Sequence, residues 1–177
     1  MSPRIDWRDA TRDDRSALEQ FRCTSPAPRD PRGRPLPHPA PYEAEVQRWL
    51  RTHKPPGSPD EIFRVGIDHE GAIAAVAVTS QLAVPDGLTF KILALAVRHD
   101  LRGSRIGGAC MDDLLQQMNE RALSTGAEQF LVFGLVDPRN TASQRMCANH
   151  DFTHVADTDD YQQWARIITV RSPSPGA

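Results

Sequence analysis

The segment "LAVRHDLRGSRIGGACMDDLL", from Leu95 to Leu115, decides how the rest of the chain is interpreted. An apolar run ends at Val97, a basic turn with three glycines follows, and an amphipathic pattern then begins. This order predicts a strand, then a glycine-bearing turn, then a helix that starts at Ser104.

A turn of this kind is suited to holding a phosphate group. The first N–H groups of a helix have no backbone partner, and the helix dipole adds positive potential at the same end. Glycines let an anion approach the backbone closely, and Arg102 and Arg105 add charged donors. The P-loop pattern and the dinucleotide fingerprint G-x-G-x-x-G are both absent, which excludes those two classes of nucleotide site. Taken alone, the turn is equally compatible with a plain helix start and solvated arginines.

Composition limits the class of protein further. A chain of 177 residues suits one domain with a sizeable core, and a net charge of −2 gives no general attraction to nucleic acid or membrane. The three cysteines are too few and too far apart for a disulfide framework or a zinc site. No apolar stretch is long enough to span a bilayer, and the charged N-terminus does not resemble a signal peptide. We therefore expect a reduced, cytoplasmic protein with no metal and no membrane partner.

A proline-rich segment interrupts the chain early. Seven of the eighteen residues from Thr24 to Pro41 are prolines, which excludes a helix interior or a central strand there. We predict a surface loop over residues 24–41, of a length often used as a lid or a partner contact. Residues 172–177 are predicted to form a disordered tail, which leaves a single domain over residues 1–171.

The remaining periodicity predicts a mixed order of helices and strands. Thr11 is the expected N-cap of the first helix, and the third helix should bury Ile106, Cys110, Leu114 and Met118. The expected helices cover residues 11–23, 41–53, 104 onward and 140–151. The expected strands cover residues 61–68, 72–84, 88–97, 128–136, 152–157 and 161–170, with a further short one at 5–10. This order predicts an α+β fold, a mixed and mostly antiparallel sheet with helices on both faces.

Two motifs resemble those of the GNAT superfamily of N-acetyltransferases. In that family a strand ending in Leu-Ala-Val precedes Arg/Gln-x-x-Gly-x-Gly/Ala at a helix start, and Leu95–Val97 followed by Arg102–Gly108 is similar, with Arg105 at the first glycine position. The stretch from Val136 to Phe152 resembles a second family motif. It matches at Val136, Asn140, Ser143, Met146 and Phe152, and it departs from the motif at Cys147, where the family has tyrosine, and at Asp151, where it has glycine.

The resemblance implies a fold with two splayed central strands and acetyl-CoA as cosubstrate between them. The strand end would pair with the pantetheine arm, the turn would hold the pyrophosphate, and Asn140 would bond the pantetheine arm or serve as an N-cap. The implied cofactor-binding residues are Leu95, Ala96, Val97, Arg102, Gly103, Ser104, Arg105, Ile106, Gly107, Gly108 and Asn140.

The identity of the acid that protonates the leaving thiolate is open. Cys147 stands at the position where the family has a tyrosine, and its side chain is shorter. We expect it to be a small core residue rather than the acid. Ser143 and Tyr161 are the alternative hydroxyls. Many relatives carry a glutamate base just before the Leu-Ala-Val strand end, and that position is Ala94, so no dedicated base is expected on this strand.

Three functions are compatible with the sequence. The first is an N-acetyltransferase acting on a primary amine of an unidentified small molecule or protein. The second resembles GNAT toxins that acetylate aminoacyl-tRNA; it is suggested by Phe21-x-Cys23 and by the arginines of the proline-rich segment, which would make tRNA a partner. The third is an acyl-CoA-binding module without catalysis, suggested by Cys147 and Ala94. A homodimer is compatible with each.

Overall fold

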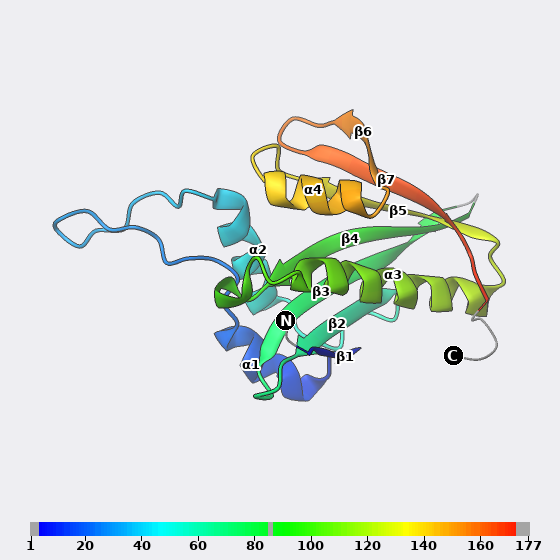
Figure 1. The fold of residues 1–177 in the computed structure, drawn as a ribbon, viewed down its shortest axis with the longest axis horizontal. Helices are drawn as coiled ribbons and strands as arrows, with labels where there is room; N and C mark the ends of the chain where they lie inside the picture. The colour runs from blue at the N-terminus through cyan, green and yellow to red at the C-terminus, as the bar shows by residue number, and fades with distance from the viewer. Residues whose placement is uncertain (1–3, 85–86, 173–177) are drawn as a thin grey trace.

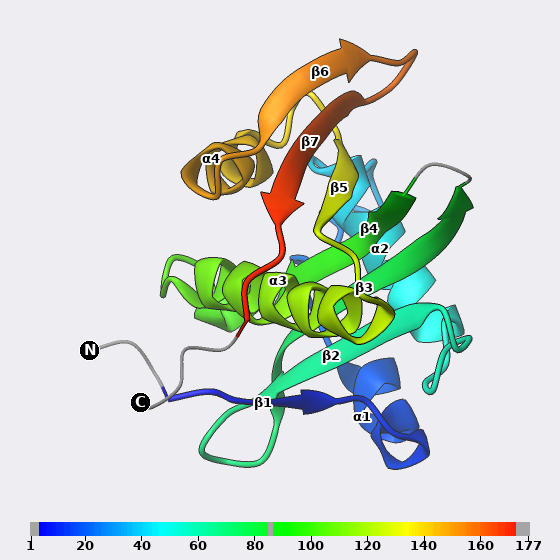
Figure 2. The same ribbon diagram turned by 90° about the vertical axis from the view of Figure 1, so that its right-hand side faces the viewer.

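The computed structural model describes residues 4–84 and 87–172, which form a seven-stranded sheet with helices on both faces (Figures 1 and 2). The strand order is β1-β2-β3-β4-β5-β7-β6, and every neighbouring pair is antiparallel except β4 and β5. The predicted α+β class, with a mixed and mostly antiparallel sheet, is confirmed. The strands are β1 Asp6–Asp9, β2 Glu61–Ile67, β3 Ile73–Val84, β4 Gly87–Val97, β5 Gln129–Val136, β6 Thr153–Asp157 and β7 Gln162–Thr169.

The sheet divides the core into two layers, each covered by helices. One buried cluster joins Leu18 and Leu50 to the β2, β3 and β4 side chains that face α1 and α2. The other joins the buried face of α3 to Phe90, Phe130 and the side of the sheet that also carries α4 (Figure 2). The helices are α1 Arg15–Gln20, α2 Pro41–Thr52, α3 Ile106–Thr125 and α4 Thr141–Asn149, with short 3-10 turns at Arg12–Asp14 and His99–Leu101.

The helix α3 buries the face that the sequence predicts. Ile106, Cys110, Leu114 and Met118 are all buried. Its first residue is Ile106 rather than the expected Ser104, because Arg105 has φ 66° and ψ 4°, a left-handed conformation that cannot continue a right-handed helix.

The first helix is shorter than the expected span of residues 11–23. A 3-10 turn precedes α1, and Asp14 Oδ2 accepts a hydrogen bond of 2.7 Å from the Thr11 amide at the predicted N-cap. The helix ends at Gln20, because the next residue, Phe21, has ψ 133°, and the side chain of Gln47 then bonds both the Phe21 carbonyl and the Cys23 amide. These hydrogen bonds pair the backbone carbonyl and amide that no longer have partners within the helix. The chain can therefore bury Phe21 and Cys23 in the core.

The proline-rich segment, residues 24–41, projects from the body as an arm (Figure 1). Its tip is a tight reversal in which Asp30 Oδ2 accepts from Arg34 Nε at 2.7 Å and the Leu36 amide donates to the Pro28 carbonyl. Within the arm, Arg29 and Pro35 form an isolated antiparallel β-bridge. Within residues 24–40 the described chain forms only this bridge and turns. Of the predicted tail, residues 173–177 lie outside the described residues.

None of the helices in the described part of the chain combines the length and apolar composition that crossing a membrane requires.

Candidate functional site

The parallel strands β4 and β5 separate partway along their length. They pair from Leu88 with Phe130 to Ile92 with Gly134, and among the described residues the pairing ends there. Beyond that point β4 continues against β3, while β5 continues against β7. The facing backbone edges of Leu93–Val97 and Leu135–Val136 are therefore free to bond a ligand that enters between them.

A β-bulge at Leu93 marks the point of separation. Ile92 pairs with Thr79 and Ala94 with Val78, which leaves Leu93 as an extra residue on β4. Leu93 and Ala94 consequently both pack toward α1 and α2, while Ile92 and Leu95 pack toward α3. Bulges bend a strand and increase its twist, so the extra residue accounts for the divergence of β4 from β5.

A cleft of about 1400 Å³ occupies this separation. On one side its lining includes the turn before α3 and the exposed side of α4, and on the other it includes α2 and the residue Tyr161. The volume exceeds that of an ordinary small-molecule pocket, which is in the range of about 300–1,000 Å³, so it has room for a coenzyme together with an acceptor.

The turn before α3 has the backbone shape that a phosphate cradle needs. Arg105, at the family's glycine position, has φ 66°, so it keeps the positive φ that glycine would provide. A Cβ built on Gly107 would lie 3.6 Å from Met146 Sδ, and one on Gly108 would lie 3.8 Å from His150 Cε1. These are ordinary contacts, so neither glycine is required for packing. The small residues leave the first amides of α3 open to the cleft.

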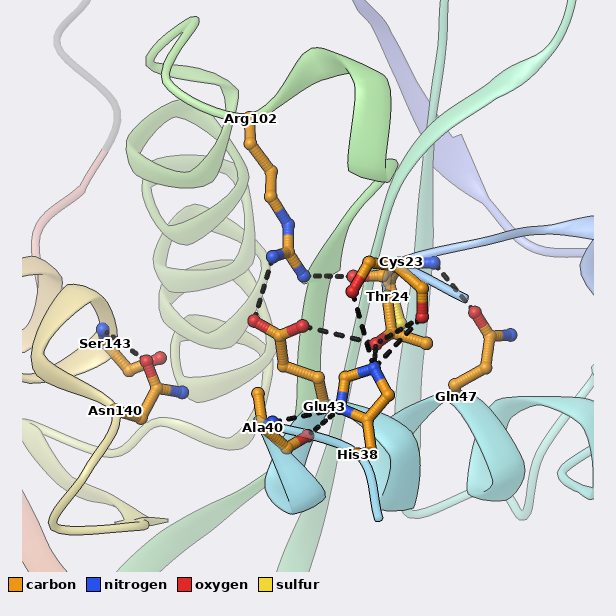
Figure 3. A network of polar contacts seen from close by, with 10 residues as sticks. Cys23, Thr24, His38, Ala40, Glu43, Gln47, Arg102, Asn140 and Ser143 are labelled. Atoms are coloured by element: carbon orange, nitrogen blue, oxygen red, sulfur yellow. Dashed lines mark hydrogen bonds and ion pairs between the residues drawn. The ribbon is translucent and has the colours of Figure 1, made fainter. Parts of the chain in front are cut away.

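The side chain of Arg102 does not point into open solvent. It donates to Glu43 Oε1 of α2 at 2.8 Å and to the Cys23 carbonyl (Figure 3). The Thr24 hydroxyl donates to the other oxygen of Glu43 at 3.2 Å. His38 Nε2 lies 2.9 Å from the Thr24 hydroxyl, which closes the base of the arm. The predicted phosphate donor is thus held by α2 and the arm.

Two cleft residues near the turn were not predicted. Arg145 of α4 is exposed on the cleft wall and forms no ion pair with any described residue. His150 lies 3.2 Å from Asp112 Oδ1 through Nε2 and 2.7 Å from the Met146 carbonyl through Nδ1. Arg145 occupies a variable position inside the second motif, and its basic character was the signal available in the sequence.

The start of α4 brings three predicted residues to the cleft. Asn140 Oδ1 accepts a hydrogen bond of 3.1 Å from the Ser143 amide, so Asn140 is the N-cap of α4 (Figure 3). Ser143 and Cys147 follow on the cleft-lining side of the helix. The bond from Asn140 to a pantetheine arm remains a prediction.

Cys147 is a core side chain that also borders the cleft. It is 5% exposed and belongs to the cluster that contains Ile106 and Phe152. Burial raises the pKa of its thiol to about 11, so the sulfur stays protonated at neutral pH and is a weak acid.

Tyr161 reaches the cleft from the loop between β6 and β7. Its hydroxyl donates to Glu45 Oε2 of α2 at 3.1 Å, and this hydrogen bond to a carboxylate, with some burial, raises the tyrosine pKa. Glu45 was not predicted as a site residue. The one sequence feature that could have indicated it is its helical spacing from Trp49 and Thr52, which also line the cleft.

The cleft carboxylates differ in how they are neutralised. Glu43 is bound by Arg102, and Asp137 is bound by Arg139 Nη2 at 2.6 Å. Glu45 has no cationic partner among the described residues and only the hydrogen bond from Tyr161. The described residues also contain no cluster of three or more histidine, cysteine or acidic side chains able to hold a metal ion.

A sheet whose one parallel pair separates beside a glycine-bearing helix start defines the fold class of GNAT acetyltransferases. The family model described as "Acetyltransferase (GNAT) family" matches residues 20–152, and the chain belongs to this family. Membership implies acetyl transfer from acetyl-CoA.

Solved structures of the same fold include the ribosomal-protein-S18-alanine N-acetyltransferase from Escherichia coli (14% identity, TM-score 0.58, 98% of this chain and 99% of that chain). The PaiA N-acetyltransferase from Thermoplasma acidophilum in complex with coenzyme A is another (10% identity, TM-score 0.65, 92% of this chain and 98% of that chain). A third is AtaTR bound with AcCoA (12% identity, TM-score 0.66, 94% of this chain and 94% of that chain). At these identities the likeness shows the fold alone. No curated protein matches the chain.

Proposed function

We propose that this protein is an N-acetyltransferase that transfers the acetyl group of acetyl-CoA to a primary amine of a small molecule or a protein. The observation that carries the proposal is the separation of β4 from β5 at Leu93, directly beside the open amides at the start of α3. Structural neighbours that hold coenzyme A or acetyl-CoA support the use of the same cosubstrate.

In this proposal the chain binds the cosubstrate at two places. The amides of Arg102–Gly108 hold the pyrophosphate, with Arg105 of the turn and Arg145 of α4 as charged donors on the same side of the cleft. The free edge of Leu95–Val97 bonds the pantetheine amides in the manner of an added strand. Both interactions orient the thioester toward the separation between the strands.

The acceptor amine reaches the thioester from the α2 side. It must first lose a proton, and Glu45 is the cleft carboxylate best able to accept one, because Glu43 and Asp137 are neutralised by arginines. The neutral amine nitrogen then forms a bond to the thioester carbonyl carbon, and the nitrogen, now positively charged, gives up its further proton to solvent water as the tetrahedral intermediate collapses. The carbon–sulfur bond breaks, and the sulfur leaves as a thiolate that takes up a proton.

The proton for that thiolate comes from water or from a hydroxyl at the cleft, Ser143 or Tyr161. Cys147 is the less suitable donor because its thiol is 5% exposed and packs in the cluster with Ile106 and Phe152, which leaves it little access to the leaving sulfur. Most of the rate enhancement then comes from placement of two reactants, one of which is already an activated acyl donor.

The proposal is tested by following free thiol released from acetyl-CoA in the presence of a panel of primary amines, with the acetylated product identified by mass. We expect release that requires both the protein and an amine. Coenzyme A binding without release for any amine would refute catalysis.

That negative result is what a second candidate function predicts, an acyl-CoA-binding module without transfer. The observations in its favour are that Cys147 is buried and that Ala94 places no carboxylate on β4. Acetylation of aminoacyl-tRNA is a third candidate, which the exposed arginines of the projecting arm favour, and inhibition of translation in a cell-free system tests it.

A further inference from the structure

We propose that the amine acceptor carries an anionic group, a carboxylate or a phosphoryl group, that is bound by Lys91 on the α2 side of the cleft. The inference rests on the acetyltransferase function proposed above, and it defines the substrate class: an amine with a negative charge at some distance from the reacting nitrogen.

The register of β4 fixes the direction in which Lys91 points. Lys91 pairs with Ser80 of β3 and Phe133 of β5, two residues before the bulge at Leu93. Its neighbour Phe90 is fully buried in the cluster under α3. Because side chains alternate along a strand, Lys91 extends to the opposite face, toward α2, and it lines the cleft there with Arg48 and Thr52.

Lys91 has no ion-pair partner in the part of the chain that the structure describes. Its side chain is half-buried, a position in which an ammonium group loses part of its hydration. Arg48, exposed on the same wall, is likewise unpaired among the described residues. The acceptor side thus presents two cations without internal counter-charges.

Two of the three carboxylates of the cleft are already paired: Glu43 is bound by Arg102 and Asp137 by Arg139. Glu45 is bonded to the neutral hydroxyl of Tyr161, so it keeps its negative charge, and it forms no ion pair with Lys91 or Arg48. A ligand that brings one positive and one negative end fits this arrangement. Its amine pairs with Glu45 and its anion with Lys91, and Arg48 adds to the positive potential.

A lysine that merely extends its ammonium into water would be indifferent to the charge of the acceptor. The test therefore compares acceptors that share one alkyl chain and differ in the far group. The probes are n-alkylamines, ω-amino carboxylates, ω-aminoalkylphosphonates and α,ω-diamines, each at chain lengths from two to six carbons. The reading is kcat/KM for release of coenzyme A.

Three variants isolate the charge of Lys91. Lys91→Met removes the charge and keeps the stem, and Lys91→Arg keeps the charge. Lys54→Met is the matched control, because Lys54 is the only other lysine of the chain, is paired with Glu19 and does not line the cleft.

We expect the wild-type protein to prefer an anionic acceptor over the matched alkylamine by tenfold or more at one chain length. Lys91→Met should lose this preference, whereas Lys91→Arg and Lys54→Met should retain most of it. A preference for the carboxylate alone, or for the phosphonate alone, identifies which anion is bound. The absence of any anionic preference at every length, or its persistence in Lys91→Met, would overturn the inference.

Binding measurements keep the inference testable if no amine of the panel is acetylated. Calorimetric titration of the same anionic amines into the protein saturated with coenzyme A should show binding that Lys91→Met abolishes, and no binding to the wild type would refute the inference. Titration of coenzyme A alone and thiol release are read separately, so a failure of acetyl transfer is distinguished from a failure of anion binding.

Discussion

Replacing Cys147 with alanine separates a packing role from an acid role, and the structure gives the size of each effect. The side chain is 5% exposed, so the change deletes one buried sulfur atom. The lost transfer free energy is comparable to that of a methylene, about 0.8 kcal/mol. The cavity left behind adds roughly 0.5 kcal/mol if about 20 Å³ remains empty. We expect the free energy of unfolding to fall by about 1–1.5 kcal/mol.

The rate of thiol release should change by no more than about threefold in the same variant. In the proposed mechanism the rate enhancement comes mainly from the placement of the two reactants and not from a proton supplied by Cys147. A true general acid contributes about 10²–10⁴ to the rate. The assay combines urea denaturation with kcat for coenzyme A release. Cys110→Ala is the matched control, since Cys110 is fully buried in the same cluster and does not line the cleft. A hundredfold loss of kcat in Cys147→Ala alone, with unchanged stability and coenzyme A affinity, would refute the reasoning.

Three further predictions follow from the turn and from the first helix. Arg105→Gly should raise the free energy of unfolding by up to about 1 kcal/mol, because φ 66° is costly for arginine, and yet weaken coenzyme A binding in calorimetry; tighter binding would show that the arginine is no phosphate donor. Gly107→Glu should weaken that binding more than tenfold and Gly107→Ala only slightly, since a Cβ fits there and a carboxylate repels the pyrophosphate; equal affinities would exclude the site. The hydrogen bonds from Arg8 lower the pKa of Asp14, so its stabilisation is present above the ordinary aspartate pKa of about 3.9 and is lost as pH falls through the lower, folded value. Asp14→Asn should therefore cost about 1 kcal/mol at pH 7 in denaturant titrations and progressively less in acid, and a cost that is constant with pH would contradict the ion pair.

The elements of the fold were readable because their apolar periods are strong. The buried face of α3 and the hairpin from β2 to β3 follow directly from spacing and turn residues. The bulge at Leu93 was not readable. The end of β4 is apolar on both faces, so its sequence has no alternation that an extra residue would interrupt.

The site was only partly readable for a different reason. The turn before α3 is a local feature, and local sequence predicts it. The contacts of Arg102 with Glu43 and of Tyr161 with Glu45 join residues 59 and 116 positions apart, so they depend on tertiary packing that no local pattern records. Arg105 was an ambiguous departure in the sequence, because only the backbone shows that it adopts the glycine conformation.

The bulge at Leu93 also has a consequence for how this chain tolerates insertions and deletions. Everything in β4 after Leu93 is offset by one residue relative to an uninterrupted pleat. Deleting Leu93 would close the offset and leave a regular ladder, in which Leu95 and Val97 still face α3 and Ala94 and Ala96 still face α2, while the bend of the strand is lost. The opening between the strands is thus encoded as one added residue, and that residue can be removed without exchanging the side chains of the two cores.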